Sequence, residues 1–73
     1  MTGEVYKLVE LTGSSDKSIS DAIEVAISRA GSTLRRLGWF EVTQVRGQIA
    51  NGKVGRYQVT LKVGFTLDSG EEP

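Results

Sequence analysis

The chain has 73 residues, with nine lysines and arginines against nine aspartates and glutamates, and it contains neither cysteine nor histidine. A chain this short forms one domain, for which we expect residues 1–73, with residues 68–73 as a disordered tail. The missing cysteine and histidine exclude disulfides, thiol chemistry and the commonest metal ligand, and the zero net charge argues against a nucleic-acid partner. No apolar segment is long enough to span a membrane, so we expect a cytoplasmic protein that gains buried surface by self-association.

The first predicted strand covers residues 4–12, whose sequence EVYKLVELT is rich in β-branched and aromatic side chains. Residues 13–17 have the composition of a loop, and a helix is predicted to begin at Ile19. Ser18 is the predicted N-cap and Asp21 the third helical residue, because both side chains can accept hydrogen bonds from unpaired backbone amides there.

The predicted helix continues to Leu37, because apolar residues recur at the spacings of three and four that mark one helical face. Arg35 and Arg36 suit its last turn, and Gly38 suits a left-handed position just past its end. The apolar stripe consists of Ile19, Ile23, Ala26, Ala30, Leu34 and Leu37. Its small members predict that the helix lies close to a sheet.

Two further strands follow, from Trp39 to Ala50 and from Arg56 to Leu67, and the second alternates strictly between apolar and polar residues. A two-residue turn between them would place polar side chains opposite apolar ones, so we predict a three-residue loop over residues 51–53. This loop sets Arg46 opposite Gln58 and Val45 opposite Val59. The predicted fold class is α+β, a three-stranded antiparallel sheet in β-α-β-β order wrapped around one helix.

No group of residues has the spacing of a catalytic dyad or a metal site, so we predict neither. Trp39, the only tryptophan, lies where the helical pattern gives way to a strand and allows two interpretations. It either covers the helix end as a core residue or offers a flat surface on which an aromatic ligand stacks. In the second case Gln58 can pair with the edge of a heterocycle, because its amide both donates and accepts.

The ordered segments VYKLVELTGSS, TLRRLGWFEV, VRGQI and GRYQVTLKVGFTL resemble those of the dodecins, a family of small flavin-binding proteins. The resemblance implies a hollow homododecamer of tetrahedral symmetry in which Trp39 stacks on one ring of a flavin pair. It also implies that Gln58 hydrogen-bonds the polar edge of the flavin and that Arg46 lies near the pocket. Gln48 is a further neighbour of this pocket, without an assigned role.

Similarity to bacterial dodecins implies FMN as the bound flavin, with riboflavin and FAD as alternatives. Some relatives also bind coenzyme A at a separate site, to which the resemblance assigns no residues here. The implied function is storage of flavin and quenching of its photochemistry, without catalysis. Two alternatives stay open: a flavin-dependent oxidoreductase, and a ligand-free structural oligomer in which Trp39 seals an interface.

Overall fold

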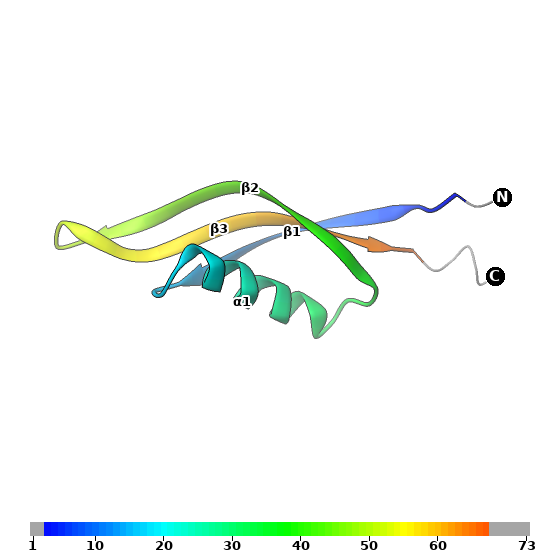
Figure 1. The fold of residues 1–73 in the computed structure, drawn as a ribbon, viewed down its shortest axis with the longest axis horizontal. Coiled ribbons are helices and arrows are strands. Elements are labelled where there is room, and N and C mark those ends of the chain that lie inside the picture. Colours follow the sequence, from blue (N-terminus) through cyan, green and yellow to red (C-terminus); the bar gives the residue numbers. More distant parts are fainter. Residues whose placement is uncertain (1–2, 68–73) are drawn as a thin grey trace.

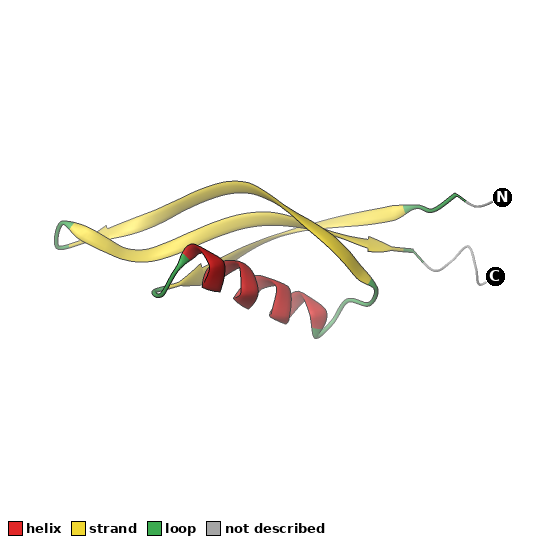
Figure 2. Ribbon diagram, in the orientation of Figure 1, coloured by secondary structure: helices red, strands yellow, loops and turns green. Residues whose placement is uncertain are grey.

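The computed structural model describes residues 3–67, which form three strands and one helix in the predicted order (Figures 1 and 2). The elements are β1 (Tyr6–Ser15), α1 (Ile19–Gly31), β2 (Leu37–Ala50) and β3 (Lys53–Thr66). β3 is the central strand and pairs antiparallel with both β1 and β2. The predicted fold class is confirmed. The predicted tail at residues 68–73 lies outside the described residues.

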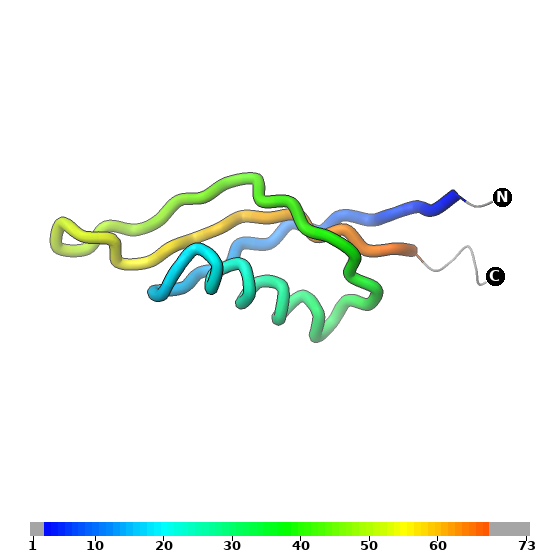
Figure 3. Tube along the Cα trace, viewed as in Figure 1, coloured from blue at the N-terminus to red at the C-terminus, as the bar shows by residue number. Residues whose placement is uncertain are grey.

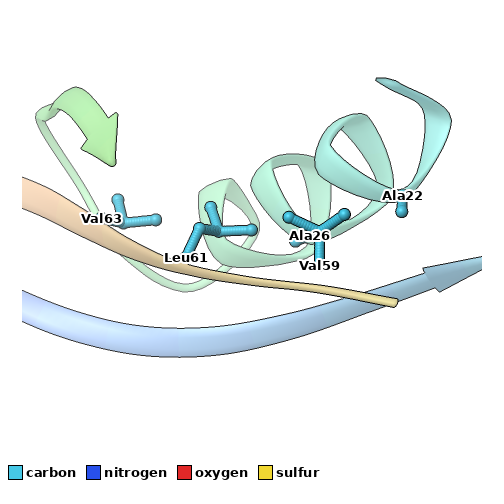
Figure 4. Packing of buried hydrophobic residues seen from close by; sticks show 5 residues of the cluster. All are labelled: Ala22, Ala26, Val59, Leu61 and Val63. Carbon is cyan, nitrogen blue, oxygen red and sulfur yellow. The ribbon is translucent and has the colours of Figure 1, made fainter. Parts of the chain in front are cut away.

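The core lies between α1 and one face of the sheet. Val59, Leu61 and Val63 of β3 are almost completely buried and point at the helix, where they meet Ala22 and Ala26 (Figure 4). The predicted close packing through small side chains is therefore confirmed. The buried face of the helix differs from the predicted apolar stripe at its start: Ala22 is buried, whereas Ile19, the first predicted member, is exposed. Within residues 3–67, no helix has the length and apolarity that crossing a bilayer requires.

Gly13 marks the closest approach of the helix to the sheet. A Cβ atom at this position would overlap the carbonyl oxygen of Ala22 and would lie 2.9 Å from the Cβ of Ala26. The prediction that residues 13–17 form a loop was wrong for its first three residues, which continue β1 and pair with β3. The glycine and serines have turn-like composition, but pairing with a neighbouring strand and packing under the helix override local propensity.

The helix begins at Ile19 with Ser18 as its N-cap, as predicted, but the Asp21 side chain accepts from a serine hydroxyl and not from a backbone amide as predicted. The side chain of Ser18 accepts a hydrogen bond from the Asp21 backbone amide at 2.9 Å. The Asp21 carboxylate accepts a hydrogen bond from the hydroxyl of Ser15 at 2.6 Å, and that hydroxyl accepts one from the Lys17 amide at 2.9 Å. These bonds join the end of β1 to the first turn of α1, so the cap also fixes the angle at which the helix leaves the sheet.

The helix ends earlier than predicted, at Gly31 rather than Leu37. The hydroxyl of Ser32 donates to the carbonyl of Arg29 at 2.7 Å, as expected for a serine that competes for helical backbone groups. Glycine, serine and threonine in succession also have low helix propensity. The left-handed residue before β2 is Arg36, with φ of 59°, and not Gly38 as predicted.

The turn between β2 and β3 contains two residues, not the three that we predicted. Asn51 and Gly52 both have positive φ, 54° and 75°, which is the conformation that Asn-Gly favours in two-residue hairpins. Ala50 therefore pairs directly with Lys53.

The predicted register of the hairpin is nevertheless confirmed, since Arg46 lies opposite Gln58 and Val45 opposite Val59. The shift that we assigned to the turn occurs inside the ladder instead. The register changes between Gln48 and Ile49, where Gly55 is the extra residue on β3. A β-bulge of this kind adds one residue to one strand and changes the alternation of faces beyond it.

The protein is thin and elongated, with principal extents of 56 × 20 × 13 Å (Figure 1). Its radius of gyration is 15.3 Å, whereas a compact domain of this length would have about 11 Å. The helix contacts β1 and β3 and leaves most of β2 uncovered. The exposed large apolar residues of β2 include Trp39, Phe40, Val42, Val45 and Ile49. So much exposed apolar surface is typical of a subunit interface.

Gly13→Ala is expected to destabilise the protein by about 1–3 kcal/mol, because the added methyl group overpacks the contact with α1. Urea unfolding at one protein concentration measures the effect. Gly31→Ala is the control, since its methyl group would meet only the Leu37 side chain, at 3.7 Å. Equal unfolding midpoints for Gly13→Ala and the unchanged protein would show that the helix does not depend on this close approach.

Candidate functional site

The candidate site lies on the face of the sheet turned away from α1, which we call the outer face. Successive residues of a strand point to opposite faces, and Val59, Leu61 and Val63 point at the helix. Their neighbours on β3 therefore belong to the outer face, together with the residues paired with them on β2. These pairs are Gln58 with Arg46, Thr60 with Gln44, Lys62 with Glu41, and Gly64 with Trp39.

A bulge in β2 brings Trp39 and Arg46 to the same face. These residues are seven positions apart, so a regular strand would send their side chains to opposite faces. The register shifts between Val42 and Gln44, where Thr43 is an extra residue, and the shift restores a shared face. A second bulge at Gly38 precedes Trp39. The trace of β2 bends along its length, unlike that of a flat strand (Figure 3).

The indole of Trp39 lies across Gly64, its partner on the central strand. A Cβ atom at Gly64 would overlap atoms Cε2 and Cζ2 of the indole and would lie 2.9 Å from Cδ2. The ring of Tyr6 is 6.1 Å from the indole, centroid to centroid, and tilted by 57°. Leu8 flanks Gly64 on the other side. Trp39 is still 42% exposed, so these residues form an apolar patch with an accessible aromatic surface.

Tyr6 is held by an acidic neighbour. Its phenol donates a hydrogen bond to Oε1 of Glu4 at 2.9 Å. This bond stabilises the neutral phenol, and the carboxylate charge also opposes formation of a phenolate, so both effects raise the pKa of Tyr6 above its ordinary value. Tyr6 therefore stays a neutral hydrogen-bond donor beside the indole at physiological pH.

The other end of the outer face is polar. Nε of Arg46 donates a hydrogen bond to Oε1 of Gln58 at 3.3 Å, and Nε of Arg56 donates to the hydroxyl of Ser14 at 2.9 Å. Gln48 lies opposite Arg56, two residue pairs further along the hairpin. Two of the residues predicted at the site, Arg46 and Gln58, are therefore brought together, with Gln48 as a neighbour on the same strand.

The structure does not bring Trp39 to this cluster within one protomer. Gly64, the partner of Trp39, and Gln58 are six residues apart on β3, which corresponds to roughly 20 Å of strand. The pair Lys62 and Glu41 lies between them on the same face. A single planar ring cannot contact both Trp39 and Gln58 of the same chain.

A small cavity lies on the helix side of the start of β2. Its volume is about 170 Å³, and it is lined by Ile27, Leu37, Gly38, Trp39, Phe40 and Val63. Small-molecule sites usually enclose about 300–1,000 Å³. The cavity is therefore too small for a three-ring ligand. Within the described part of the chain, no three acidic side chains lie close enough together to hold a metal ion.

Two residues of the site, Gly64 and Tyr6, were missed in the sequence. A signal for Gly64 was present, because it is the only glycine among the outward-facing residues of β3 from Gln58 to Thr66. Glycine inside a central strand often marks a place where another group approaches the backbone closely. Nothing in the local sequence relates Tyr6 to Trp39, because the two residues lie on strands separated by β3.

The fold and the outer face define a small β-α-β-β protein that presents an exposed aromatic patch and a separate polar cluster. The sequence model of the dodecin family matches residues 5–68, and the chain belongs to this family. A dodecin of Thermus thermophilus is 52% identical over 66 residues, which cover 90% of this chain and 96% of that protein.

Solved structures agree with this assignment. A crystal structure of a Thermus thermophilus protein has a TM-score of 0.86 at 52% identity and covers 89% of this chain and 96% of its own. The structure of dodecin from Streptomyces coelicolor has a TM-score of 0.87 at 49% identity and covers 92% of this chain and 96% of its own. Both the sequence and the three-dimensional arrangement therefore support membership of the family.

Glu4→Gln is expected to lower the pKa of Tyr6, because glutamine removes the charge that opposes phenolate formation. An ultraviolet difference titration measures this pKa, and a Tyr57→Phe background leaves Tyr6 as the only tyrosine. Glu10→Gln in the same background is the control and should leave the titration unchanged. An identical pKa in the Glu4→Gln variant would rule out the contact between Glu4 and Tyr6.

Proposed function

We propose that this protein binds and stores flavin in a homododecamer, with the indole of Trp39 as the stacking surface. The observation that carries the proposal is the position of this indole, which lies against Gly64 on one side and stays 42% exposed. A large exposed aromatic ring held against a rigid sheet suits a planar ligand, because stacking then costs little further ordering. Membership of the dodecin family supports the same function.

The proposed function includes protection against light. An indole in van der Waals contact with an excited isoalloxazine ring can donate an electron to it and recover that electron quickly. The excited state then decays before it emits light or reacts with other molecules. The proposal assigns no catalytic residue, because binding and quenching require only contact between the two rings.

Each flavin site is proposed to combine residues from different copies of the chain. Trp39 and Gln58 are separated by roughly 20 Å of strand within a protomer, a distance longer than the isoalloxazine ring. Both residues can contact one flavin only if a second copy supplies one of them. The thin shape and the exposed apolar surface of β2 favour such an assembly.

Gln58 is proposed to bind the polar edge of the ring, and Arg46 to orient Gln58. Arg46 donates to Oε1 of Gln58, which leaves the amide nitrogen of Gln58 free to donate to a carbonyl oxygen of the flavin. Oε1 has a second lone pair that can accept from a ring N–H. The guanidinium also adds positive charge near the site, and this charge favours a phosphorylated flavin.

We propose FMN as the physiological flavin, because its phosphate suits this charge and because similarity to bacterial dodecins implies FMN. Gln48 lies beside the cluster and is proposed as a neighbour of the pocket without a defined contact. Binding of coenzyme A stays a prediction with no residues assigned to it, and so does a cytoplasmic location.

FMN fluorescence should be quenched when the purified apoprotein is added, and Trp39→Ala should weaken binding by about 10- to 100-fold. This range corresponds to the roughly 1–3 kcal/mol that stacking on an aromatic side chain contributes. Phe40→Leu is the control, because Phe40 pairs with Val63 and faces the helix side. Size-exclusion chromatography must show the same assembly for each variant.

Two results would contradict the proposal. If the wild-type protein leaves FMN fluorescence unaltered, flavin binding at Trp39 is excluded. FMN affinity that stays unchanged in Trp39→Ala, within an intact assembly, would show that the indole is not the stacking surface.

A mixing experiment tests whether a site combines two copies. Trp39→Ala and Gln58→Leu chains are coexpressed, at an FMN concentration that fills the unchanged protein but neither variant alone. If the two residues come from different copies, about one site in four of a random mixture retains both and binds FMN. If they came from one chain, no site would retain both, and the mixture would bind no more FMN than the separate variants.

A further inference from the structure

The backbone conformation at position 64 does not require glycine. Among the described glycines only Gly52 has a positive φ, so the backbone at Gly64 is open to any residue. Glycine inside a strand also destabilises the protein relative to alanine, because its backbone loses more conformational freedom on folding. What excludes a Cβ at Gly64 is the indole of Trp39, whose atoms Cε2 and Cζ2 occupy its place.

We propose that Gly64 is a positioning residue, which lets the indole of Trp39 lie flat on the sheet and so sets where a flavin stacks. The inference rests on the proposed flavin binding and adds the residue that orients its aromatic wall. With a methyl group at position 64, the indole must tilt or lift from the backbone. A tilted ring cannot make full face-to-face contact with a planar ligand.

Neighbouring residues limit the alternatives open to the displaced indole. The tilted ring of Tyr6 stands at one side, with a centroid separation of 6.1 Å, and its phenol is fixed by Glu4. The central strand β3 lies beneath the indole and is hydrogen-bonded on both sides. The indole is therefore expected to move outward, into the space that the ligand would occupy.

The same contact has a purely structural explanation, in which the tryptophan only shields the bare backbone of a glycine. That explanation predicts that a methyl group at position 64 changes the stability of the protein but not its affinity for flavin. The two explanations differ in the affinity for flavin of a protein that still assembles.

The test compares Gly64→Ala with Gly38→Ala. Gly38 neighbours Trp39 in β2, and an added Cβ there would make only ordinary contacts, 3.7 Å from the Gly64 carbonyl oxygen and 3.8 Å from the Tyr6 ring. We expect Gly64→Ala to bind FMN at least about 10-fold more weakly than Gly38→Ala, a loss within the roughly 1–3 kcal/mol range of stacking. The near-ultraviolet circular dichroism of the flavin-free protein should change in Gly64→Ala only.

A double variant keeps the test decisive if Gly64→Ala fails to assemble. Trp39→Ala removes every atom that an added Cβ at position 64 would overlap, so Gly64→Ala should be tolerated in a Trp39→Ala background. Thermal unfolding of the four proteins in this cycle then gives a coupling between positions 39 and 64. Damage from Gly64→Ala that disappears in the Trp39→Ala background supports the inference, and equal damage in both backgrounds overturns it.

The outcomes separate this inference from the proposed function. If the unchanged protein binds no FMN, the proposed function fails, while the circular dichroism still reports whether Gly64 orients the indole. If the unchanged protein binds FMN and Gly64→Ala binds it equally well in an intact assembly, the proposed function stands and the positioning role of Gly64 is wrong.

Discussion

The candidate site on the outer face is built on the contact between Trp39 and Gly64. This contact is set by the register of β2 against β3. Gly64 belongs to the central strand, whose other face carries the buried Val59, Leu61 and Val63. A shift of one residue in β2 would turn the indole of Trp39 to the opposite face of the sheet, away from Gly64. The packing of α1 against the buried residues of β3 in turn places Gly64 on the outer face.

The helix covers only part of the sheet, and this has consequences for the whole molecule. Its buried face is formed by alanines, which allow it to approach β1 at Gly13 but bury little apolar surface. Most of β2 and the hairpin beyond the helix stay exposed (Figure 1). A protomer with this shape gains stability from contacts with other copies, in the same region where the proposed site needs a second chain.

The two ends of the outer face differ in chemistry. Tyr6, Leu8 and Trp39 offer apolar and aromatic surface, whereas Arg46 and Gln58 offer hydrogen bonds and charge. A flavin has both an aromatic body and a polar edge. Assembly of several chains can bring unlike ends together around one ligand, which a single protomer of this length cannot do.

The sequence by itself determined the order of the elements, the start of the helix at Ile19 after the N-cap Ser18, and the pairing of Arg46 with Gln58, because alternation and capping are local patterns. It also singled out Trp39 and Gln58. Only the tertiary structure decided that residues 13–15 join β1, because pairing with β3 outweighs weak local propensity. The bulges at Thr43 and Gly55 and the contact of Trp39 with Gly64 were likewise decided between strands, where no single segment carries the signal.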